Sequence, residues 1–475
     1  GQFEIKKPMK KILLLTLIIT IYLSGCKLGP DFQKPDYNNP ESFRFDSVQT
    51  DTTINLYWWK LFNDPVLDTL IVTALRENKD VLVAAARIES ARANIGYTNA
   101  DQYPTFSYSV GAGTGNYAGI KQPNSSNNFY AYPELNWEIG FWGKYRRLNE
   151  VAQADLLASE YGKRTIQMSL ISSVASTYFD LLSNKEKLLV SERTLASRDS
   201  GLLIIEARYK WGIVAEIDLN QSQVQRAISA AAVPQYKRAV ALTESSLSIL
   251  LGNNPCVIET ASSLLEMNFP PDIPTGLPSQ LLERRPDIKQ AEAELMSQNA
   301  QIGAAEAMRW PSLNLTGLLG VASTDLSSLT TGGLAWSAGG SLLGPLFQFG
   351  KNKKRAEMAR FETEAKLYEY ESTVLQAFKD VEDALISIQT LKEELVAQEM
   401  RYKAATNAEM LSENRYSLGE TSYLEVLDSQ RQSFEAQLDY TQTRTNLLST
   451  YIELYKALGG GWLSPQEETN ANAGK

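Results

Sequence analysis

Histidine is absent from the 475-residue chain, and cysteine occurs only twice, as Cys26 and Cys256. Histidine is the side chain that most often serves as a general base near neutral pH, and it is also a common metal ligand. The absence of histidine and the scarcity of cysteine remove the usual metal ligand and general base, along with most nucleophile and base pairs of enzymes. We therefore expect no catalytic residues, no metal site and no enzyme activity.

Basic residues are too few to make a surface for nucleic acid. The chain has 46 Lys and Arg against 55 Asp and Glu, a net charge of −9. Residues 1–25 contain four lysines and one glutamate, so this segment carries +3 and the chain from Cys26 onward carries −12, which is −9 minus +3. An acidic chain offers no cationic stripe to displace counterions from phosphates, so nucleic acid is excluded as a partner.

Long apolar runs are also scarce. The clearest is Ile12–Leu23, twelve residues that follow four lysines. Twelve residues are too few to cross a bilayer, but they suit the central part of a secretory signal. We predict that residues 1–25 are a leader and signal peptide.

This signal ends in Leu23-Ser24-Gly25-Cys26, which resembles a bacterial lipobox. The resemblance implies that Cys26 receives a diacylglycerol and a fatty acyl chain and becomes the mature N-terminus; we expect no other cofactor. Each buried CH₂ contributes about 0.8 kcal/mol, so two or more acyl chains hold this end on a membrane. An ordinary signal followed by a chance cysteine is the alternative. Once Cys26 is acylated, Cys256 has no partner for an intramolecular disulfide.

Proline is missing from Leu346–Ser464, and within this run one glycine interrupts a helical pattern. The stretch Arg415–Gln430 reads RYSLGETSYLEVLDSQ, with polar residues around Gly419 before apolar periodicity resumes. This pattern predicts that one helix ends and another begins, as at the tip of an αα-hairpin. The same punctuation occurs around Gly212, 207 residues earlier.

The spacing of 207 residues extends far beyond the two tips. When the chain is shifted by 207 positions, identical residues coincide in one register, and they include glycines and prolines that punctuate the chain. Examples are Asp80 and Asp287, Gly96 and Gly303, Pro104 and Pro311, Gly143 and Gly350, Tyr209 and Tyr416, and Gly252 and Gly459. We infer a tandem duplication of one structural unit.

Each unit has the same predicted order: an alanine-rich helix, two strands, a very long helix and a return helix. The long helices, at about 143–211 and 350–418, contain no proline, and roughly 68 residues at 1.5 Å each extend about 100 Å. Pro234 should kink or break the first return helix. Along the chain we expect an extended arm at 26–64 that follows the predicted lipid anchor, helices at 65–101, 143–252, 286–309 and 350–459, strands at 102–142 and 310–349, a linker at 253–285, and a C-terminal tail at 460–475.

A short aromatic cluster precedes the first predicted helix. It contains Tyr57, Trp58, Trp59, Leu61 and Phe62, and we interpret it as a packing anchor, with a ligand site as the alternative. Asp64 followed by proline is typical of a helix cap with proline in the first turn.

The strand segments alternate apolar and polar residues. Phe106, Tyr108 and Val110 alternate with Thr and Ser, and residues 134–141 follow the same pattern. This alternation resembles the code of a membrane β-barrel, although a half-buried sandwich shows it too. Four strands cannot close a barrel in lipid, where each unpaired backbone group costs several kcal/mol. If the strands face lipid, three chains would supply twelve of them.

These features together resemble the TolC-type outer-membrane factors, and more narrowly their lipoprotein branch. The resemblance is carried by the lipobox, the duplicated unit, the strand-to-helix junctions at 141–144 and 349–351, and the tip sequence RYSLGETSYLEVLDSQR. It implies a mainly α fold with membrane β-structure: a homotrimer whose twelve-stranded β-barrel in the outer membrane continues as an α-helical barrel in the periplasm. It further implies a passive exit duct for efflux, surrounded by outer-membrane lipid, that works with a periplasmic adaptor (membrane fusion protein) and an inner-membrane RND-type transporter.

The resemblance also assigns a periplasmic gate by position. Asp428 matches a ring of carboxylates, Leu424 matches a leucine one turn earlier, and Glu425 matches a second acidic position. Leu424 and Asp428 are four residues apart, so they share one helical face. A solvated helix face is the alternative for the two acidic residues. The gate set is Asp428, Leu424, Glu425, Asp218, Tyr416 and Arg415.

The last three members of this set have different origins. Asp218 occupies the position of Glu425 in the first repeat, and Tyr416 matches a tyrosine that latches the closed tip in some members. Where that latch uses an arginine two residues after the tip glycine, this chain has Thr421, and Arg415 is the candidate substitute. Tip turns and adaptor docking are assigned to Gly212, Gly419 and Ser422.

Two other functions fit part of the sequence. A periplasmic coiled-coil adaptor or scaffold lipoprotein explains the long helices and the lipid anchor, but not the alternating strand segments. An exported enzyme with paired carboxylates, such as a glycosidase, needs its acidic pair in a compact pocket. Asp218 and Glu425 fall on helix tips instead. The sequence leaves the transported substrate open.

Overall fold

The computed structural model describes residues 27–36, 40, 42–45, 57–115, 126–260, 263–270, 278–331 and 333–460. The predicted signal peptide, Cys26 and the tail from residue 461 onward lie outside the described residues. The chain divides into two compact units. Unit one holds the chain up to Asp36 together with Arg87–Glu160 and Gln290–Glu371. Unit two holds Tyr37–Ala86, Tyr161–Lys289 and the chain from Ser372 onward.

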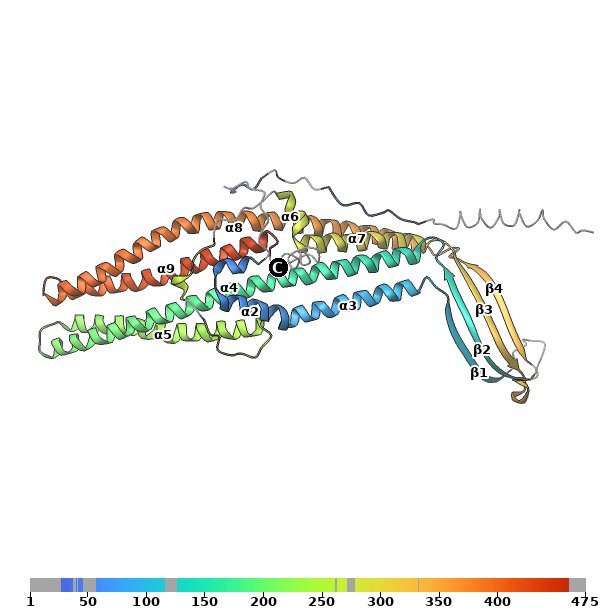
Figure 1. Cartoon of the computed structure of the whole chain (residues 1–475), viewed down its shortest axis with the longest axis horizontal. Coiled ribbons are helices and arrows are strands. Elements are labelled where there is room, and N and C mark those ends of the chain that lie inside the picture. The colour runs from blue at the N-terminus through green and yellow to red at the C-terminus, as the bar shows by residue number, and fades with distance from the viewer. Residues whose placement is uncertain are drawn as a thin grey trace, which may run out of the picture. The chain divides into compact units, whose positions relative to one another are not determined.

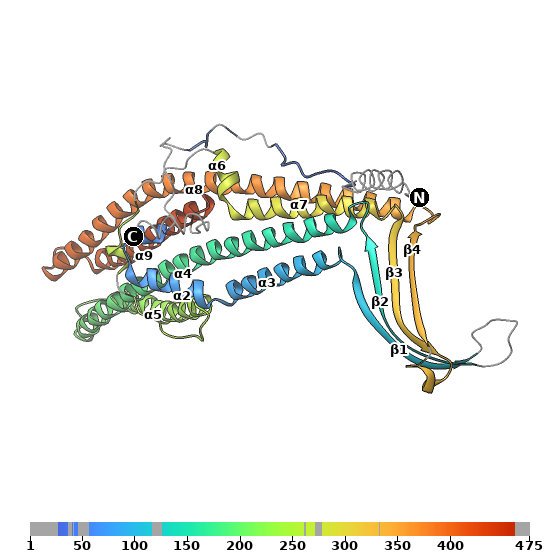
Figure 2. The same ribbon diagram turned by 45° about the vertical axis from the view of Figure 1, so that its right-hand side comes forward.

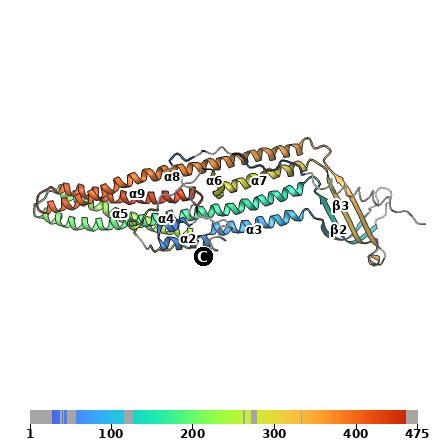
Figure 3. The same ribbon diagram turned by 45° about the horizontal axis from the view of Figure 1, so that its top comes forward.

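The helices occur in two sets that repeat along the chain (Figure 1). The first set is α3 (Lys79–Ala100), α4 (Lys144–Lys210) and α5 (Glu216–Leu250), and the second is α7 (Pro286–Ala307), α8 (Lys351–Ser417) and α9 (Tyr423–Ala457). Every helix of the second set begins and ends 207 residues after its counterpart. The predicted duplication is therefore confirmed. In the three ribbon views, α5 runs back along α4 and α9 runs back along α8 (Figures 1 and 3).

Shorter helices fill the remaining segments. They are η1 (Trp58–Phe62), α2 (Pro65–Glu77), η2 (Leu264–Glu266), α6 (Pro278–Arg284) and η3 (Leu326–Ser328). The carboxylate of Asp64 caps α2, because its Oδ1 accepts the backbone N–H groups of Val66 and Leu67 at 2.8 and 3.2 Å. Pro234 lies inside α5, and the helix continues through it. The alternative that Pro234 marks a break is wrong.

Unit one contains a four-stranded antiparallel sheet in the order β1-β2-β3-β4 (Figure 2). The strands are β1 (Thr105–Gly115), β2 (Ser126–Ile139), β3 (Ser312–Ser323) and β4 (Leu334–Leu343). Within the described residues, β1 pairs only with β2 and β4 pairs only with β3, so the sheet has two open edges. The apolar side chains of β1 are uncovered in the single chain: Phe106, Tyr108 and Val110 are between 73% and 84% exposed. A mainly helical fold with four strands per chain is confirmed.

Unit two holds an extensive apolar core. Trp58 is 1% exposed and stacks on Tyr455 with the ring centroids 5.0 Å apart. Phe62 packs on Phe179 at 4.9 Å. The predicted aromatic packing anchor before α2 is confirmed. None of the helices in the described part of the chain carries an apolar stretch sufficient to cross a membrane.

Candidate functional site

The two helical hairpins end in turns of identical construction. Gly212 and Gly419 have φ angles of +69° and +76°, which side chains with a Cβ rarely adopt. After α4, the N–H of Ile213 reaches the carbonyl of Arg208 at 2.8 Å, and after α8 the N–H of Glu420 reaches that of Arg415 at 2.9 Å. These bonds satisfy carbonyls left over at each helix end in a Schellman cap. The predicted turn-forming glycines therefore occupy left-handed positions.

Directly behind the turns, side chains from all four hairpin helices meet. The guanidinium of Arg208 on α4 lies 4.9 Å from the ring centroid of Tyr416 on α8. The Tyr416 ring packs on Tyr423 of α9 at 5.2 Å, and the Tyr423 hydroxyl lies 3.1 Å from the hydroxyl of Ser222 on α5. The Tyr416 hydroxyl is buried and has no hydrogen-bond partner among the described residues. Within one chain, Tyr416 thus contributes its ring rather than its hydroxyl.

The second-repeat turn is crossed by an ion pair. Arg415 Nη1 lies 2.8 Å from Glu425 Oε1, and the hydroxyl of Thr421 donates to Glu425 Oε2. Both charged side chains are about half exposed (50% and 44%), so the pair contributes roughly 0.2–1 kcal/mol. The structure therefore brings Arg415, Thr421 and Glu425 together. Thr421 occupies the position at which the latch arginine was expected, and Arg415 lies beside it.

Leu424 and Asp428 lie one turn apart on α9, and both are exposed in the single chain. Leu424 is 58% exposed, and the side chain of Asp428 is 51% exposed. Asp428 accepts hydrogen bonds from Arg431 Nη2 at 2.8 Å and from Gln432 Nε2 at 2.6 Å. The bond from Arg431 first, and that from Gln432 second, lower the pKa of the Asp428 carboxyl below its ordinary value. Asp428 is thus ionised at neutral pH beside a partly compensating cation.

The first-repeat counterpart of Glu425 has a local role. Asp218 Oδ2 accepts the backbone N–H of Ala215 at 3.3 Å, which ties the start of α5 to the turn before it. Asp218 and Glu425 both lie in the first turn of a helix, where negative charge interacts favourably with the helix dipole. Ser422 is the N-cap residue of α9, but its side chain makes no capping hydrogen bond.

Four residues of this site, Arg208, Tyr423, Ser222 and Arg431, were not predicted from the sequence. Arg208 is the first-repeat counterpart of Arg415, since the two residues are 207 positions apart, so the repeat register alone would have found it. Arg431 also had a local signal, because it lies three residues after Asp428 on the same helix, a spacing at which opposite charges pair. Tyr423 and Ser222 have no comparable signal, because their contact depends on which helix faces which. In the described part of the chain, no three His, Cys, Asp or Glu side chains are grouped so as to hold a metal ion.

Comparison with known proteins identifies the family. The family model described as outer membrane efflux protein matches residues 70–253 and again residues 277–460. The chain belongs to this family. Its two matched segments are themselves displaced by 207 residues, so the family pattern follows the duplication.

Individual relatives match over nearly the whole chain. The probable efflux pump outer membrane protein TtgC of Pseudomonas putida is 32% identical and covers 98% of this chain and 99% of its own length. The probable outer membrane lipoprotein SilC of Salmonella typhimurium is 32% identical, over 96% of this chain and all of its own. A solved structure of the outer-membrane channel OprN superposes with a TM-score of 0.83 at 28% identity, covering 92% of this chain and 100% of OprN.

These similarities decide between the functions that the sequence left open. The protein is an outer-membrane efflux channel with a TolC-like fold and an internal duplication. The predicted family and outer-membrane localisation are confirmed, and the alternative of a periplasmic adaptor without a channel is wrong. The family is one of transport channels.

Proposed function

We propose that three copies of this chain form the exit duct of a tripartite efflux pump. Substrates would enter from an inner-membrane RND-type transporter and a periplasmic adaptor, and would cross the outer membrane passively. The observation that carries the proposal is the sheet with two open edges, β1 and β4. An open edge in lipid leaves backbone groups without hydrogen bonds, so other copies must pair with both edges.

The second part of the proposal is lipidation of Cys26. The apolar run and the residues Leu23-Ser24-Gly25-Cys26 support it. A further support is that the relative SilC carries the name of an outer membrane lipoprotein. Diacylglycerol and a fatty acyl chain on Cys26 would anchor the chain in outer-membrane lipid.

The third part is a gate at the helix tips. Leu424 and Asp428 would face the axis of the trimer, where three carboxylates repel each other and attract cations. Glu425, Asp218, Arg415 and Tyr416 would hold the closed arrangement, and the turns at Gly212, Gly419 and Ser422 would dock the adaptor. The exposure of Leu424 and Asp428 in the single chain supports this assignment, because exposed side chains can contact the same residues of the other two copies. An adaptor that binds the splayed tips more tightly would open the gate.

The test is single-channel conductance of the purified protein in planar bilayers. The wild-type chain should run as a trimer in native gels and conduct, and Asp428→Ala should conduct more because the charged constriction is lost. Glu399→Ala, which removes a similarly exposed carboxylate on α8, is the matched control and should leave conductance unchanged. A trimer that conducts neither as wild type nor as Asp428→Ala would contradict the channel. An Asp428→Ala variant that conducts like wild type would contradict only the gate.

A further inference from the structure

The chain immediately after Cys26 is bound by a buried arginine at the start of α4. Arg147 has a side chain that is only 2% exposed. Its Nε donates to the carbonyl of Leu28 at 2.9 Å, and its Nη2 donates to the carbonyl of Gly29 at 2.7 Å. Its Nη1 reaches Asp31 at 3.1 Å and Glu150 at 2.9 Å. A buried guanidinium with this many partners is a recognition element, since leaving it unpaired would be costly.

Two glycines allow the segment to come this close. Gly29 has a φ of +85°, and a Cβ at this position would lie 2.4 Å from the Cα of Gly303 on α7. A Cβ at Gly303 would lie 2.5 Å from Arg147 Nε and 2.6 Å from the Leu28 carbonyl oxygen. A real Cβ atom cannot come this close to its neighbours, so neither glycine can be replaced without a shift. The backbone of Gly29 therefore packs directly against the backbone of Gly303. Asn299 on α7 adds a bond from its Nδ2 to the Pro30 carbonyl at 3.2 Å.

The repeat-equivalent positions are not built this way. Gly96 is the counterpart of Gly303, and a Cβ added there would meet no neighbouring group within 4 Å. Lys354, the counterpart of Arg147, is 74% exposed and pairs with Glu357 one turn along its own helix. The duplicated unit therefore preserves the glycine, whereas the bound segment is found only at Arg147 and Gly303 among the described residues. Gly96 can therefore serve as a control for substitutions at Gly303.

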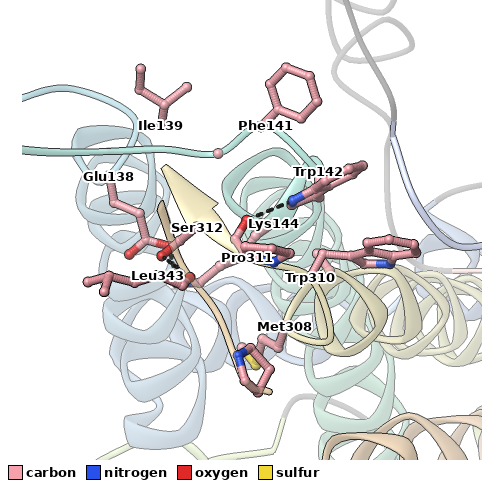
Figure 4. Close-up of a pocket in the computed structure, with 13 residues that line it drawn as sticks. Glu138, Ile139, Phe141, Trp142, Lys144, Met308, Trp310, Pro311, Ser312 and Leu343 are labelled. Carbon is pink, nitrogen blue, oxygen red and sulfur yellow. Dashed lines mark hydrogen bonds and ion pairs between the residues drawn. The ribbon is translucent and has the colours of Figure 1, made fainter. Parts of the chain in front are cut away.

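The bound segment also touches the junction at which β2 ends and α4 begins. The N–H of Leu28 approaches the carbonyl of Trp142 at 3.4 Å. Trp142 in turn donates from its indole to the carbonyl of Pro311, at the start of β3, at 2.8 Å, and packs on Trp310 at 4.9 Å (Figure 4). These side chains line a pocket of about 270 Å³. Leu28 thus lies beside Trp142, which joins the end of β2 to the residue before β3.

We propose that Arg147 and Gly303 form a docking site for the mature N-terminus, which positions the acyl chains of Cys26 beside the strand ends. Leu28 follows Cys26 by only two positions in the chain, so the modified residue stays within about 7 Å of backbone from the docked carbonyl. The lipid anchor then enters the bilayer at the depth where the sheet begins. This inference rests on the proposed lipidation of Cys26, but the docking itself does not require the lipid.

The experiment follows the mobility of the segment. A nitroxide is attached at Gln33→Cys, an exposed residue just beyond the docked part, in a Cys256→Ser background, and electron paramagnetic resonance is recorded on the protein in vesicles. The unaltered site should give an immobilised spectrum.

Gly303→Ala should lose the immobilised component, because the new methyl group displaces Arg147 and Leu28. Gly96→Ala adds the same methyl group at the open counterpart and should retain that component. Arg147→Gln serves as a second disrupting variant if Gly303→Ala does not fold.

A parallel series carrying Cys26→Ser separates docking from lipidation. Mass spectrometry of the N-terminal peptide reports whether acylation occurs in the Cys26 series, independently of the spectra. The proposal expects an immobilised label with and without the lipid. A label that becomes mobile in Cys26→Ser would show that the membrane tether, not Arg147, holds the segment, and would overturn the docking site. So would an immobilised label in Gly303→Ala or Arg147→Gln. A chain that docks but is never acylated would overturn only the lipidation of Cys26 and the anchor position that depends on it.

Discussion

At the scale of single residues, the charge on Asp428 is set by its neighbours on the same helix. The hydrogen bond from Arg431 is the largest cause of its lowered pKa. Cation selectivity that depends on Asp428 should therefore persist as the pH falls, and should be lost only when the pH passes below this lowered pKa. Replacing Arg431 with Gln removes the main cause, so the pKa rises and selectivity should be lost at a higher pH.

Reversal potentials in a salt gradient, recorded at decreasing pH, would measure this shift. Arg401→Gln is a suitable control, because Arg401 pairs with Asp439 rather than with Asp428. Arg401→Gln should lose cation selectivity at the same pH as wild type. If Arg431→Gln and wild type gave superimposable pH profiles, Asp428 would not be the group that sets selectivity.

A second residue-scale prediction concerns the core of unit two. Trp58 is 1% exposed and stacks on Tyr455. Trp58→Ala leaves a large cavity, so we expect a loss of about 3–5 kcal/mol in the free energy of unfolding. Tyr57→Ala is the matched control, because the neighbouring Tyr57 is 42% exposed, and it should cost far less. Urea unfolding, monitored by the circular dichroism signal of the helices, would give the free energy of unfolding of each variant. Equal losses in Trp58→Ala and Tyr57→Ala would contradict the assigned core.

Residue-scale geometry was the least accessible from sequence. The aromatic cluster around Trp58 and the cap at Asp64 depend on local chemistry, and both were predicted correctly. The contact of Arg208 with Tyr416 joins residues on different hairpins, so no local pattern encodes it. Which rotamer brings Arg415 to Glu425 is likewise decided only when the helices are in place.

At the scale of elements, the hairpin turns depend on the left-handed conformation of one glycine each. A Cβ added at Gly419 would meet nothing within 4 Å, so a side chain there has no steric neighbour and only backbone strain remains. Gly419→Ala should therefore destabilise the turn by about 1–2 kcal/mol. Gly419→Asn should cost less, because asparagine tolerates this conformation.

Hydrogen exchange of the amides around residue 419 would measure the difference. Faster exchange in Gly419→Ala than in Gly419→Asn is the expected order, with the turn around Gly212 unchanged in both. Equal exchange in the two variants would mean that the conformation of Gly419 does not limit the stability of the tip.

The ends of the long helices and of the return helices could be predicted from the sequence. Glycine and proline at helix ends act locally, so the starts and ends of α4, α5, α8 and α9 lie within a few residues of the punctuation in the sequence. Strand pairing is not local. The alternation in β1 and β2 indicated strands, but the register of Thr105 opposite Asn136 emerges only in the folded sheet.

At the scale of the whole molecule, the duplication determines how the sheet can continue. Thr105 pairs with Asn136 between β1 and β2, and Ser312 pairs with Leu343 between β3 and β4, with both partners moved by 207 residues. The pairing between β2 and β3 joins one repeat to the next. In the proposed trimer, β4 of one copy and β1 of its neighbour form the equivalent junction, so the same register should apply there.

This symmetry specifies a pair of residues in two different copies. Asn136 lies opposite Thr316 between β2 and β3. The equivalents, 207 residues later and earlier, are Leu343 on β4 and Ser109 on β1. Directly opposed residues have their Cβ atoms about 4.5–5.5 Å apart, close enough for a disulfide after small adjustments. Ser109→Cys with Leu343→Cys, in a Cys256→Ser background, should therefore cross-link into covalent trimers.

Gel electrophoresis in detergent without reductant would detect these trimers, and reductant should return them to monomers. Each single cysteine should give no closed trimer, because every copy must supply both partners. Ser109→Cys combined with Ser341→Cys shifts the register by two residues and should cross-link far less, because diagonal neighbours lie about 7–8 Å apart. If the shifted pair cross-linked as well as the matched pair, the edge strands would meet in another register, and the duplication would not extend across the boundary between copies.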